Sequence, residues 1–403
     1  MLQHDGAASV PCVEAGQRVL AGQVIGLADS NDDAVPVHAS TSGRVTGIVQ
    51  VETPHACDVP AVLIEPDGRD EWAPPADAPV EPGDLADLTE RISRAGVAGV
   101  GPNAPAVADV LAAAGRHGVR HVIINAMESE PYLTAEYRIL ADHGRLIVRT
   151  ADLLANLLGA QRLWLALDRA NRYLLGELRR LVHGTSVRIA PLRNKYPQGA
   201  VPLLVRGLLG REVPYGGSPL DVGAVVLDGC AVLAIAQAVL EGRPCVDRIV
   251  TVAGGAADRP GNYRVPIGTP VHRLIEYVGL RRTVRRVVIG GPMRGLAVSS
   301  PQVVTTKRVG AVMLLSEDQV VARPRGPCIR CGWCLEDCPV GLDPPSVLAA
   351  VETFRTDGAQ HEEIAGLFPH ACLGCGICSY VCPAGLPLAD GLARARTLVS
   401  VRS

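Results

Sequence analysis

Hydrophobic and polar residues alternate over the first 65 positions of the chain, in short runs that glycine interrupts. Such runs occupy residues 17–20, 23–26 and 42–48. A period of two is typical of strands with one buried face, and turns at this density separate strands that are only a few residues long. We therefore predict a small all-β module over residues 1–65.

A stretch rich in proline, alanine and acidic residues follows, and we predict a linker over residues 66–84. Apolar residues then recur with helical spacing in several segments, and continuous apolar runs lie between these segments. This alternation is typical of an α/β layer domain with a largely parallel sheet. We place this domain at residues 85–243, with helices at 85–95, 107–114, 151–159, 171–182 and 232–241 and strands at 121–125, 163–167 and 224–227.

The segment 244–320 has a different pattern, because two short apolar strands precede a single amphipathic helix. A small ββα unit of this kind is similar to a β-grasp. Its small-residue sequence Gly290–Gly295 does not stand between a strand and a helix as a nucleotide-binding glycine loop does, so we interpret it as a tight structural turn. We place strands at 248–254, 263–269 and 284–289 and the helix at 271–278.

Composition narrows the classes of function. The 403 residues exceed what one hydrophobic core organises, and an apolar content of 48% is that of a packed globular chain. A net charge of −2 and an aromatic content of 3% argue against nucleic-acid binding, which requires basic surface and stacking side chains. We see no signal peptide and no apolar stretch of roughly twenty residues. We therefore expect a soluble or peripheral protein in a reducing compartment.

The last predicted domain, residues 321–403, contains one cysteine phrase twice: three cysteines two residues apart, a fourth three residues further on, and then proline. This spacing is typical of a chain that holds two [4Fe–4S] clusters, and the fourth cysteine of each run usually ligates the other cluster. Zinc would favour separated pairs of ligands. We predict one ligand set of Cys328, Cys331, Cys334 and Cys382, and a second of Cys372, Cys375, Cys378 and Cys338.

The other four cysteines are scattered, and we expect them to be packed as small reduced hydrophobic side chains. They are Cys12, Cys57, Cys230 and Cys245. Helices are expected between and beside the cluster ligands at 344–354 and 361–366.

The β module contains a segment, 36–43, at the place where biotinyl and lipoyl domains carry their modified turn. No lysine stands there, so we interpret the module as a barrel-sandwich scaffold without the carrier function.

Several phrases in a fixed order give the chain a resemblance to the RnfC family, the C subunits of the Rnf ion-translocating electron-transport complex. These phrases are residues 3–7, 37–43, 124–132, 195–199, 221–223, 290–293 and the two cysteine runs. The resemblance extends over nearly the whole chain. It implies a multidomain α/β and α+β fold: a barrel-sandwich module, a complex-I-like flavin and NADH domain, a soluble-ligand-binding β-grasp (SLBB), and a two-cluster ferredoxin-like α domain. It also implies a further segment before the first residue of this sequence.

The resemblance implies a pocket for FMN and NADH beside Asn125, Glu128 and Glu130, which end the strand at 121–125, where open α/β sheets place ligands. The alternative is a solvated turn in which Glu128 caps a backbone amide. Lys195 is a candidate phosphate partner; the alternative for this residue is a solvated loop lysine. The family's phosphate loop corresponds to residues 96–108, with Gly99 and Gly101 as its candidate contacts.

This loop departs from the family pattern. Pro102 lacks an amide donor, and no lysine or arginine follows before Arg116, so a phosphate there is poorly neutralised. Two versions of the function therefore stay open. In one, FMN and NADH bind and electrons leave through the clusters; in the other, a protein donor such as ferredoxin supplies electrons to a flavin-free relay.

The resemblance implies a component of a membrane complex, at the cytoplasmic side of the inner membrane, rather than a stand-alone enzyme. We predict no catalytic residue in this chain. A third hypothesis is a non-redox assembly subunit, against which the complete set of eight cysteine ligands argues.

Overall fold

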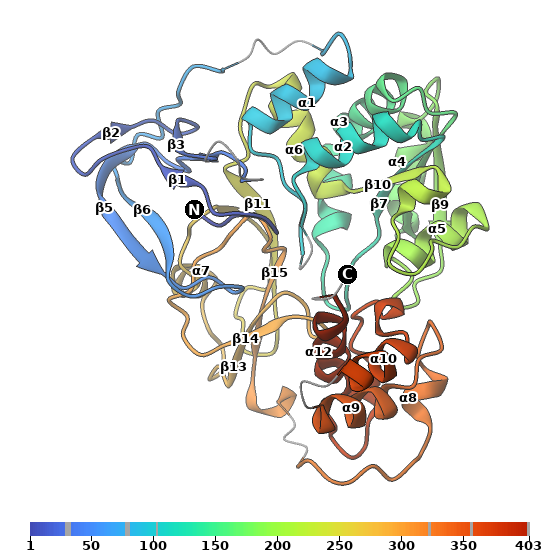
Figure 1. Cartoon of the computed structure of the whole chain (residues 1–403). Helices are drawn as coiled ribbons and strands as arrows, with labels where there is room; N and C mark the ends of the chain where they lie inside the picture. The colour runs from blue at the N-terminus through green and yellow to red at the C-terminus, as the bar shows by residue number, and fades with distance from the viewer. Residues whose placement is uncertain (29–33, 77–80, 102–103, 321–323, 355–357, 401–403) are drawn as a thin grey trace.

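The computed structural model describes residues 1–28, 34–76, 81–101, 104–320, 324–354 and 358–400. Four parts follow one another along the chain, and each has its own hydrophobic core. In Figure 1 the N-terminal β part and the β-grasp part lie on the left, the α/β part lies at the upper right, and the C-terminal helical part lies below it. The predicted fold class is confirmed; the boundaries given above remain predictions.

The N-terminal part consists of two three-stranded antiparallel sheets, in the orders β1-β3-β4 and β2-β5-β6. The alternation in the sequence sets the inner face: in β5, Gly43 and Val45 are buried while Arg44 and Thr46 are exposed. The strands are β1 (Val10–Pro11), β2 (Arg18–Val19), β3 (Val24–Leu27), β4 (Val37–His38), β5 (Gly43–Val51) and β6 (Val59–Pro66).

The first residues of the segment predicted as a linker contact this barrel. The backbone amide of Ala21 donates to Glu71 O, and the amide of Ala73 donates to Ala21 O. The Trp72 ring also lies under the Arg243 guanidinium, 4.4 Å from the ring centroid. Residues 71–73 are therefore held against the barrel, whereas 77–80 lie outside the described residues.

The α/β part has a four-stranded sheet in the order β10-β7-β8-β9, and every neighbouring pair is parallel. Ile124 of β7 packs in one core and Ile123 packs in another on the opposite face. Both faces are therefore covered, as the continuous apolar runs predicted. The strands are β7 (His121–Ala126), β8 (Arg162–Asp168), β9 (Val187–Leu192) and β10 (Ala224–Asp228); the helices are α1 (Leu85–Arg94), α2 (Val107–His117), α3 (Ala135–Leu157), α4 (Arg172–Leu181), α5 (Val201–Leu209) and α6 (Gly229–Leu240), with a 3₁₀ turn η1 (Pro219–Val222).

The helix predicted at 151–159 is only the end of α3, which begins at Ala135. His143 has non-helical dihedrals, with φ −122° and ψ 15°, and it divides the helix into two halves. The next residue, Gly144, brings α3 close to α4, since an added Cβ would lie 3.3 Å from Leu181. The prediction missed residues 135–150 of α3, which lie on both sides of this break. Strand β9 and helix α5 were also missed.

The β-grasp part has a mixed five-stranded sheet in the order β12-β11-β15-β13-β14, packed against α7. The strand predicted at 263–269 corresponds to β12, which begins at Gly261 and ends at Pro266. The elements are β11 (Asp247–Ala253), β12 (Gly261–Pro266), α7 (Val271–Val278), β13 (Arg286–Ile289), β14 (Leu296–Val298), β15 (Ala311–Leu315) and the 3₁₀ turn η2 (Glu317–Gln319).

The C-terminal part is helical and repeats one arrangement: a cysteine loop, a short helix, a proline and a longer helix. Gly332 and Gly376 precede the two short helices with φ of 84° and 74°, the left-handed region that suits glycine. The helices are α8 (Trp333–Glu336), α9 (Pro344–Thr353), α10 (Gly358–Gly366), α11 (Ile377–Val381) and α12 (Leu388–Ser400), with a 3₁₀ turn η3 (Pro369–Ala371).

A buried lysine joins the first three parts. Lys307 is 1% exposed, and its Nζ donates to Pro36 O at 3.0 Å and to Gly96 O at 2.6 Å. The carbonyl of Pro36 belongs to the segment that carries the modified turn in biotinyl and lipoyl domains. In this chain the segment therefore contacts the buried Lys307 of the β-grasp part.

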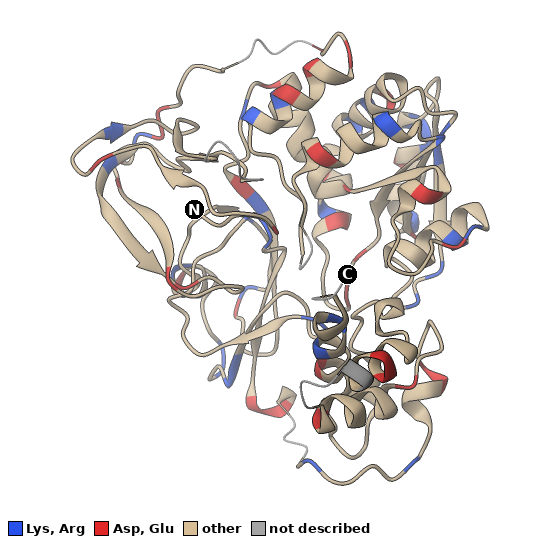
Figure 2. Cartoon of the chain, in the orientation of Figure 1, with Lys and Arg blue, Asp and Glu red and all other residues tan. Residues whose placement is uncertain are grey.

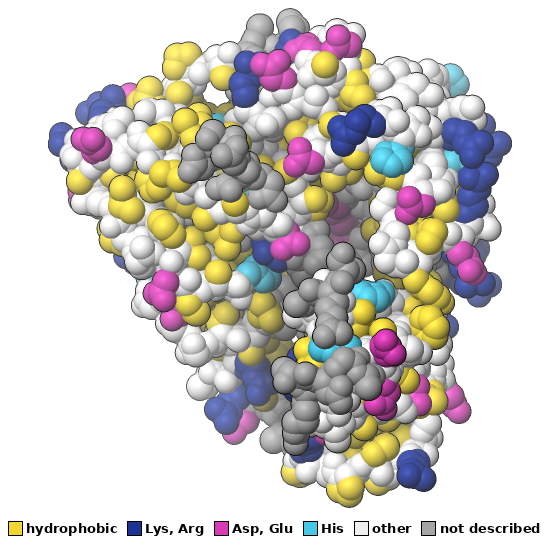
Figure 3. Space-filling model, in the orientation of Figure 1, with side chains coloured by type: hydrophobic (Ala, Val, Ile, Leu, Met, Phe, Trp, Pro, Cys, Tyr) yellow, Lys and Arg dark blue, Asp and Glu magenta, His cyan; other side chains and the backbone are white. Residues whose placement is uncertain are grey.

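Acidic and basic residues occur in each of the four parts (Figure 2). On the face shown in Figure 3, hydrophobic side chains gather over the barrel. The exposed hydrophobic residues of the barrel strands include Val10, Leu27, Ile48 and Leu63. Among the described helices, none combines the length and apolar character needed to cross a lipid bilayer.

Candidate cluster sites and strand-end pocket

The eight cysteines of the two runs form two groups of four. The electrostatic neighbours of Cys334 are Cys331, Cys382 and Cys328. Those of Cys378 are Cys372, Cys375 and Cys338. Each group thus combines three cysteines of one run with the fourth of the other, which is the arrangement expected for two cross-ligated clusters.

A zinc site places its sulfur ligands close together. Zn–S bonds of about 2.3 Å would bring the sulfurs of a zinc site to about 4 Å from one another. Among the described residues, no group of three or more His, Cys, Asp or Glu side chains is arranged to hold one ion, and all the described cysteines are free thiols.

The second group lines an enclosed and largely apolar cavity, together with Pro339, Leu342 and Ile377. Backbone amides point at its sulfurs: Gly374 N lies 3.3 Å from Cys372 Sγ, and Leu342 N lies 3.3 Å from Cys338 Sγ. Burial raises the pKa of the free Cys378 thiol to about 12.

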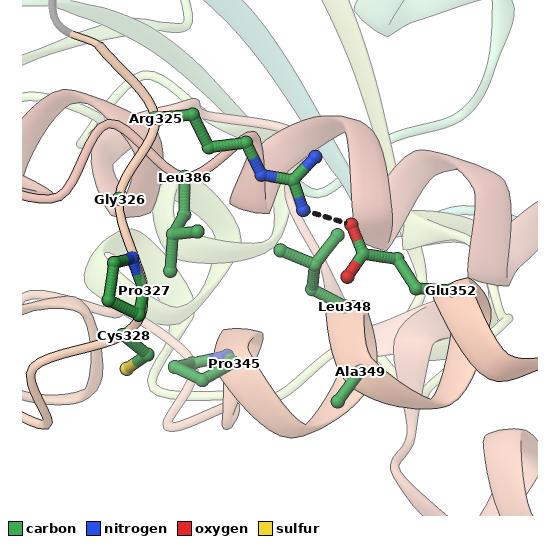
Figure 4. Close-up of a pocket in the computed structure, with 9 residues that line it drawn as sticks. All are labelled: Arg325, Gly326, Pro327, Cys328, Pro345, Leu348, Ala349, Glu352 and Leu386. Atoms are coloured by element: carbon green, nitrogen blue, oxygen red, sulfur yellow. Dashed lines mark hydrogen bonds and ion pairs between the residues drawn. The ribbon is translucent and has the colours of Figure 1, made fainter.

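The first group is more open to solvent. Cys328 and Cys331 are exposed, and the neighbouring Ile329 is 64% exposed. Figure 4 shows a pocket of about 460 Å³ beside Cys328, which Leu348 and Leu386 line. An ion pair between Arg325 and Glu352 borders it.

A pocket of about 340 Å³ lies at the carboxyl ends of β7 and β8. Three of the predicted site residues, Glu128, Glu130 and Lys195, line it. Asn125 lies beneath, where its Nδ2 donates to Gly199 O at 3.0 Å. The pocket is lined by residues 127–128, 130–134, 137, 168, 171 and 194–199.

Glu128 is the most perturbed acid at this pocket. Its Oε1 accepts a hydrogen bond from Tyr137 N at 2.8 Å, near the start of α3, so it does cap a backbone amide. Burial, and to a lesser degree the charge of Asp168, raises the pKa of Glu128 to about 7. Burial also raises the pKa of Asp168, the last residue of β8.

Glu130 is engaged by the turn at residues 290–295. Its Oε2 accepts hydrogen bonds from Met293 N at 2.8 Å and Arg294 N at 3.0 Å, and its Oε1 lies 3.4 Å from Arg294 Nε. Its side chain is only 5% exposed. A Cβ on Gly291 would overlap the Glu130 carboxylate, so the small residues of this turn permit a close structural contact.

Two amides of the predicted phosphate loop are bonded within the chain. Gly99 N donates to Pro105 O, and Gly101 N donates to Arg308 O. Neither Gly99 nor Gly101 lines the pocket. Pro102 lies outside the described residues.

The structure therefore brings Glu128, Glu130 and Lys195 together above Asn125, and it does not bring Gly99 and Gly101 to them. Sequence reasoning missed Asp168 and Tyr196, which also line the pocket. Asp168 ends a buried parallel strand, the same signal that identified Glu128.

The expectation for the four remaining cysteines is half correct. Cys230 and Cys245 are buried in the α/β core, but Cys12 and Cys57 are exposed. Both exposed residues lie in the β part, whose small core leaves most positions near the surface.

Profiles of four domain families match the chain in the order of its four parts. Residues 1–69 match the RnfC barrel sandwich hybrid domain, and residues 92–237 match the Nuo51 FMN-binding domain. Residues 249–297 match the SLBB domain, and residues 327–387 match the 4Fe-4S dicluster domain.

The chain is also similar to curated proteins over most of its length. It is 34% identical over 345 residues to the C subunit of the proton-translocating ferredoxin:NAD(+) oxidoreductase complex of Clostridium ljungdahlii, covering 85% of this chain and 75% of that protein. It is 36% identical over 369 residues to the C subunit of the ion-translocating oxidoreductase complex of Pseudomonas aeruginosa, covering 90% of this chain and 47% of that protein. The chain thus spans about half the length of the Pseudomonas protein.

A solved structure shares the fold. An NAD⁺-reducing [NiFe]-hydrogenase in the H₂-reduced state aligns with a TM-score of 0.55 at 19% identity, covering 79% of this chain and 63% of the hydrogenase chain. The two relatives match most of the chain, and the barrel sandwich hybrid profile matches its first 69 residues. The chain therefore belongs to the RnfC family, the C subunits of ion-translocating oxidoreductase complexes.

Proposed function

We propose that this chain is an electron-transfer subunit of an Rnf-type membrane-associated oxidoreductase, which passes electrons between NADH or FMN and redox partners through two [4Fe–4S] clusters. The observation that carries the proposal is the grouping of the eight cysteines into two sets of four, each drawn from both runs. Its partners are the other subunits of a membrane complex, as the names of its relatives indicate for those proteins. It is a peripheral subunit at the cytoplasmic side of the inner membrane.

The clusters supply one-electron chemistry, and the chain supplies their ligands and surroundings. Cys328, Cys331, Cys334 and Cys382 hold one, and Cys372, Cys375, Cys378 and Cys338 hold the other. Cross-ligation keeps the two clusters close, because each ligand loop reaches into the other's site.

The strand-end pocket is the candidate site for a flavin ring and a nicotinamide. Glu128, Glu130 and Lys195 line it, and Asn125 supports it from below. Lys195 is exposed beside the pocket and is its one cation among the described lining residues, so it is the candidate phosphate partner. Similarity to the Nuo51 FMN-binding domain over residues 92–237 supports this assignment.

The glycine loop does not fit a phosphate in this structure. A phosphate cradle needs amides that point at the ligand, and the amides of Gly99 and Gly101 are both bonded within the chain. This observation favours a second candidate function, a flavin-free relay that takes electrons from a protein donor such as ferredoxin, in which the α/β part is purely structural.

Anaerobic purification of the whole chain tests both. We expect about eight irons per chain for two cubane clusters, acid-labile sulfide in equal amount, and loss of iron in Cys372→Ser but not in Cys12→Ser, which changes an exposed cysteine outside the clusters. A chain that assembles no cluster after anaerobic reconstitution would refute electron transfer and return the assembly-subunit hypothesis.

Flavin extraction and NADH addition then separate the two candidates. Extractable FMN together with bleaching of the visible spectrum by NADH selects the flavin version. Eight irons with no flavin and no response to NADH select the relay version.

A further inference from the structure

The two cysteine runs have the same spacing of ligands, but their surroundings differ. The first ligand loop, residues 328–334, carries the exposed Cys328 and Cys331, and an added Cβ on its Gly332 would meet nothing within 4 Å. The second ligand loop, residues 372–378, is packed against the α/β and β-grasp parts. The repeat is therefore symmetric in ligands and asymmetric in its contacts.

One side chain of the strand-end pocket reaches the second ligand loop directly. The hydroxyl of Tyr196 donates to the backbone carbonyl of Cys375, a predicted ligand, at 2.6 Å. The same Tyr196 lines the pocket beside Lys195.

The turn at residues 290–295 contacts the same loop. An added Cβ on Gly376 would overlap Met293 O, so the two backbones are in close contact. Arg294 follows Met293 in the same turn. Arg294 is held in turn by Glu130, which also lines the pocket.

From these contacts we infer that Tyr196 is a positioning residue, which fixes the second ligand loop against the strand-end pocket so that the cluster held by Cys338, Cys372, Cys375 and Cys378 is the one next to the pocket. The inference rests on the proposed function only in requiring that the clusters assemble; it does not require that flavin binds. Tyr196 acts through the backbone of Cys375 and touches neither sulfur nor iron.

The test is Tyr196→Phe in the full chain with both clusters, because phenylalanine keeps the ring and removes only the donor. Tyr215→Phe is the matched control. Tyr215 lies in the α/β part, and its ring centroid is 6.4 Å from that of Phe368 in the helical part. The control substitution therefore removes a hydroxyl near the same interface and leaves both ligand loops unchanged. Anaerobic hydrogen–deuterium exchange, resolved by peptide, compares loop 372–378 with loop 328–334 in each protein.

We expect Tyr196→Phe to accelerate exchange in loop 372–378 by about two- to tenfold, the range for loss of one hydrogen bond, and to leave loop 328–334 unchanged. In an anaerobic redox titration followed by electron paramagnetic resonance, one of the two cluster potentials should shift while the other stays. Tyr215→Phe should match the wild type in both measurements.

Unchanged exchange and unchanged potentials in Tyr196→Phe would overturn the inference. Equal changes in both loops would also overturn it, since they would indicate general loosening. If the wild type itself assembled no clusters, the proposed function would fail before this comparison is made, so the two failures are distinguishable.

Discussion

The Glu128 carboxyl, just beyond the end of β7, has a raised pKa. Burial raises this pKa by more than the hydrogen bond from Tyr137 N lowers it. Its pKa is about 7 in the folded chain and about 4.5 in the unfolded chain. Between these values the folded state binds the extra proton, so stability is greatest at the lower pH and falls as pH rises from about 4.5 through 7. The other acids behind it, Glu136 and Asp228, also have raised pKa values through burial.

We predict that Glu128→Gln removes its share of this dependence, at most about 1.4 kcal/mol per pH unit. The variant should gain stability relative to the wild type as pH rises from 6 to 8. Infrared titration should show a protonated carboxyl band that fades over this range in the wild type and is weaker in the variant. Identical bands in the two proteins would contradict the prediction.

Arg294 places a cation beside the second ligand loop, and Glu130 holds it there. Positive charge near a cluster favours the reduced form, which carries one more electron. We predict that Arg294→Gln lowers the potential of one cluster only, measured by anaerobic redox titration. Arg282→Gln is the control, because Arg282 pairs with Asp318 at the surface, where both side chains are at least 60% exposed. A raised or unchanged potential in Arg294→Gln would contradict the prediction.

At the scale of elements, the two glycines that precede α8 and α11 form a matched pair. Both have positive φ, so an alanine at either position costs about 1 kcal/mol from the backbone alone. Only Gly376 also faces a backbone atom, Met293 O. We predict that Gly332→Ala lowers stability by about this amount and that Gly376→Ala lowers it by more.

Thermal unfolding under anaerobic conditions and iron content per chain check this pair. Gly376→Ala should show the lower melting temperature and the larger loss of iron. Equal losses in the two variants would show that the contact between the turn at 290–295 and α11 contributes nothing.

Helices and strands were predictable where the hydrophobic period of the sequence continued without a break and residues at both ends marked the limits of the element. Helix α2 begins at Val107 as expected and ends before Gly118, whose φ of 62° terminates it. Strand β7 is a continuous apolar run ending in a polar turn, and its parallel pairing followed from the alternation with helices. Residues 135–150 of helix α3 were missed, and the break at His143 lies within this part, beside Gly144, which packs close to α4.

At the scale of the whole molecule, Lys307 joins three parts through two carbonyls from distant segments. Burial lowers the pKa of Lys307 to about 8, so it still carries its charge at neutral pH. We predict that Lys307→Met destabilises the chain by about 2–5 kcal/mol, because the Pro36 and Gly96 carbonyls lose their donor inside the molecule. Anaerobic thermal unfolding should register the loss.

Arg273→Met is the comparison for this change. Arg273 pairs with Glu276 on the surface, where the side chains are 69% and 60% exposed, so its loss should cost no more than about 0.5 kcal/mol. Equal losses of stability in the two variants would mean that the contact of Lys307 with the barrel does not stabilise the fold.

The sequence by itself determined the chemistry of the clusters and the order of the parts. Ligand spacing is local, so the cysteine runs specify their cofactor before any tertiary contact forms, and hydrophobic period is local in the same way. Only the tertiary structure decided which cysteine loop lies against the strand-end pocket, through Tyr196 and the turn at 290–295. It also decided that neither Gly99 nor Gly101 lines the pocket that Glu128 and Lys195 line. Contacts between segments a hundred or more residues apart depend on how separate cores pack, and no local pattern encodes that packing.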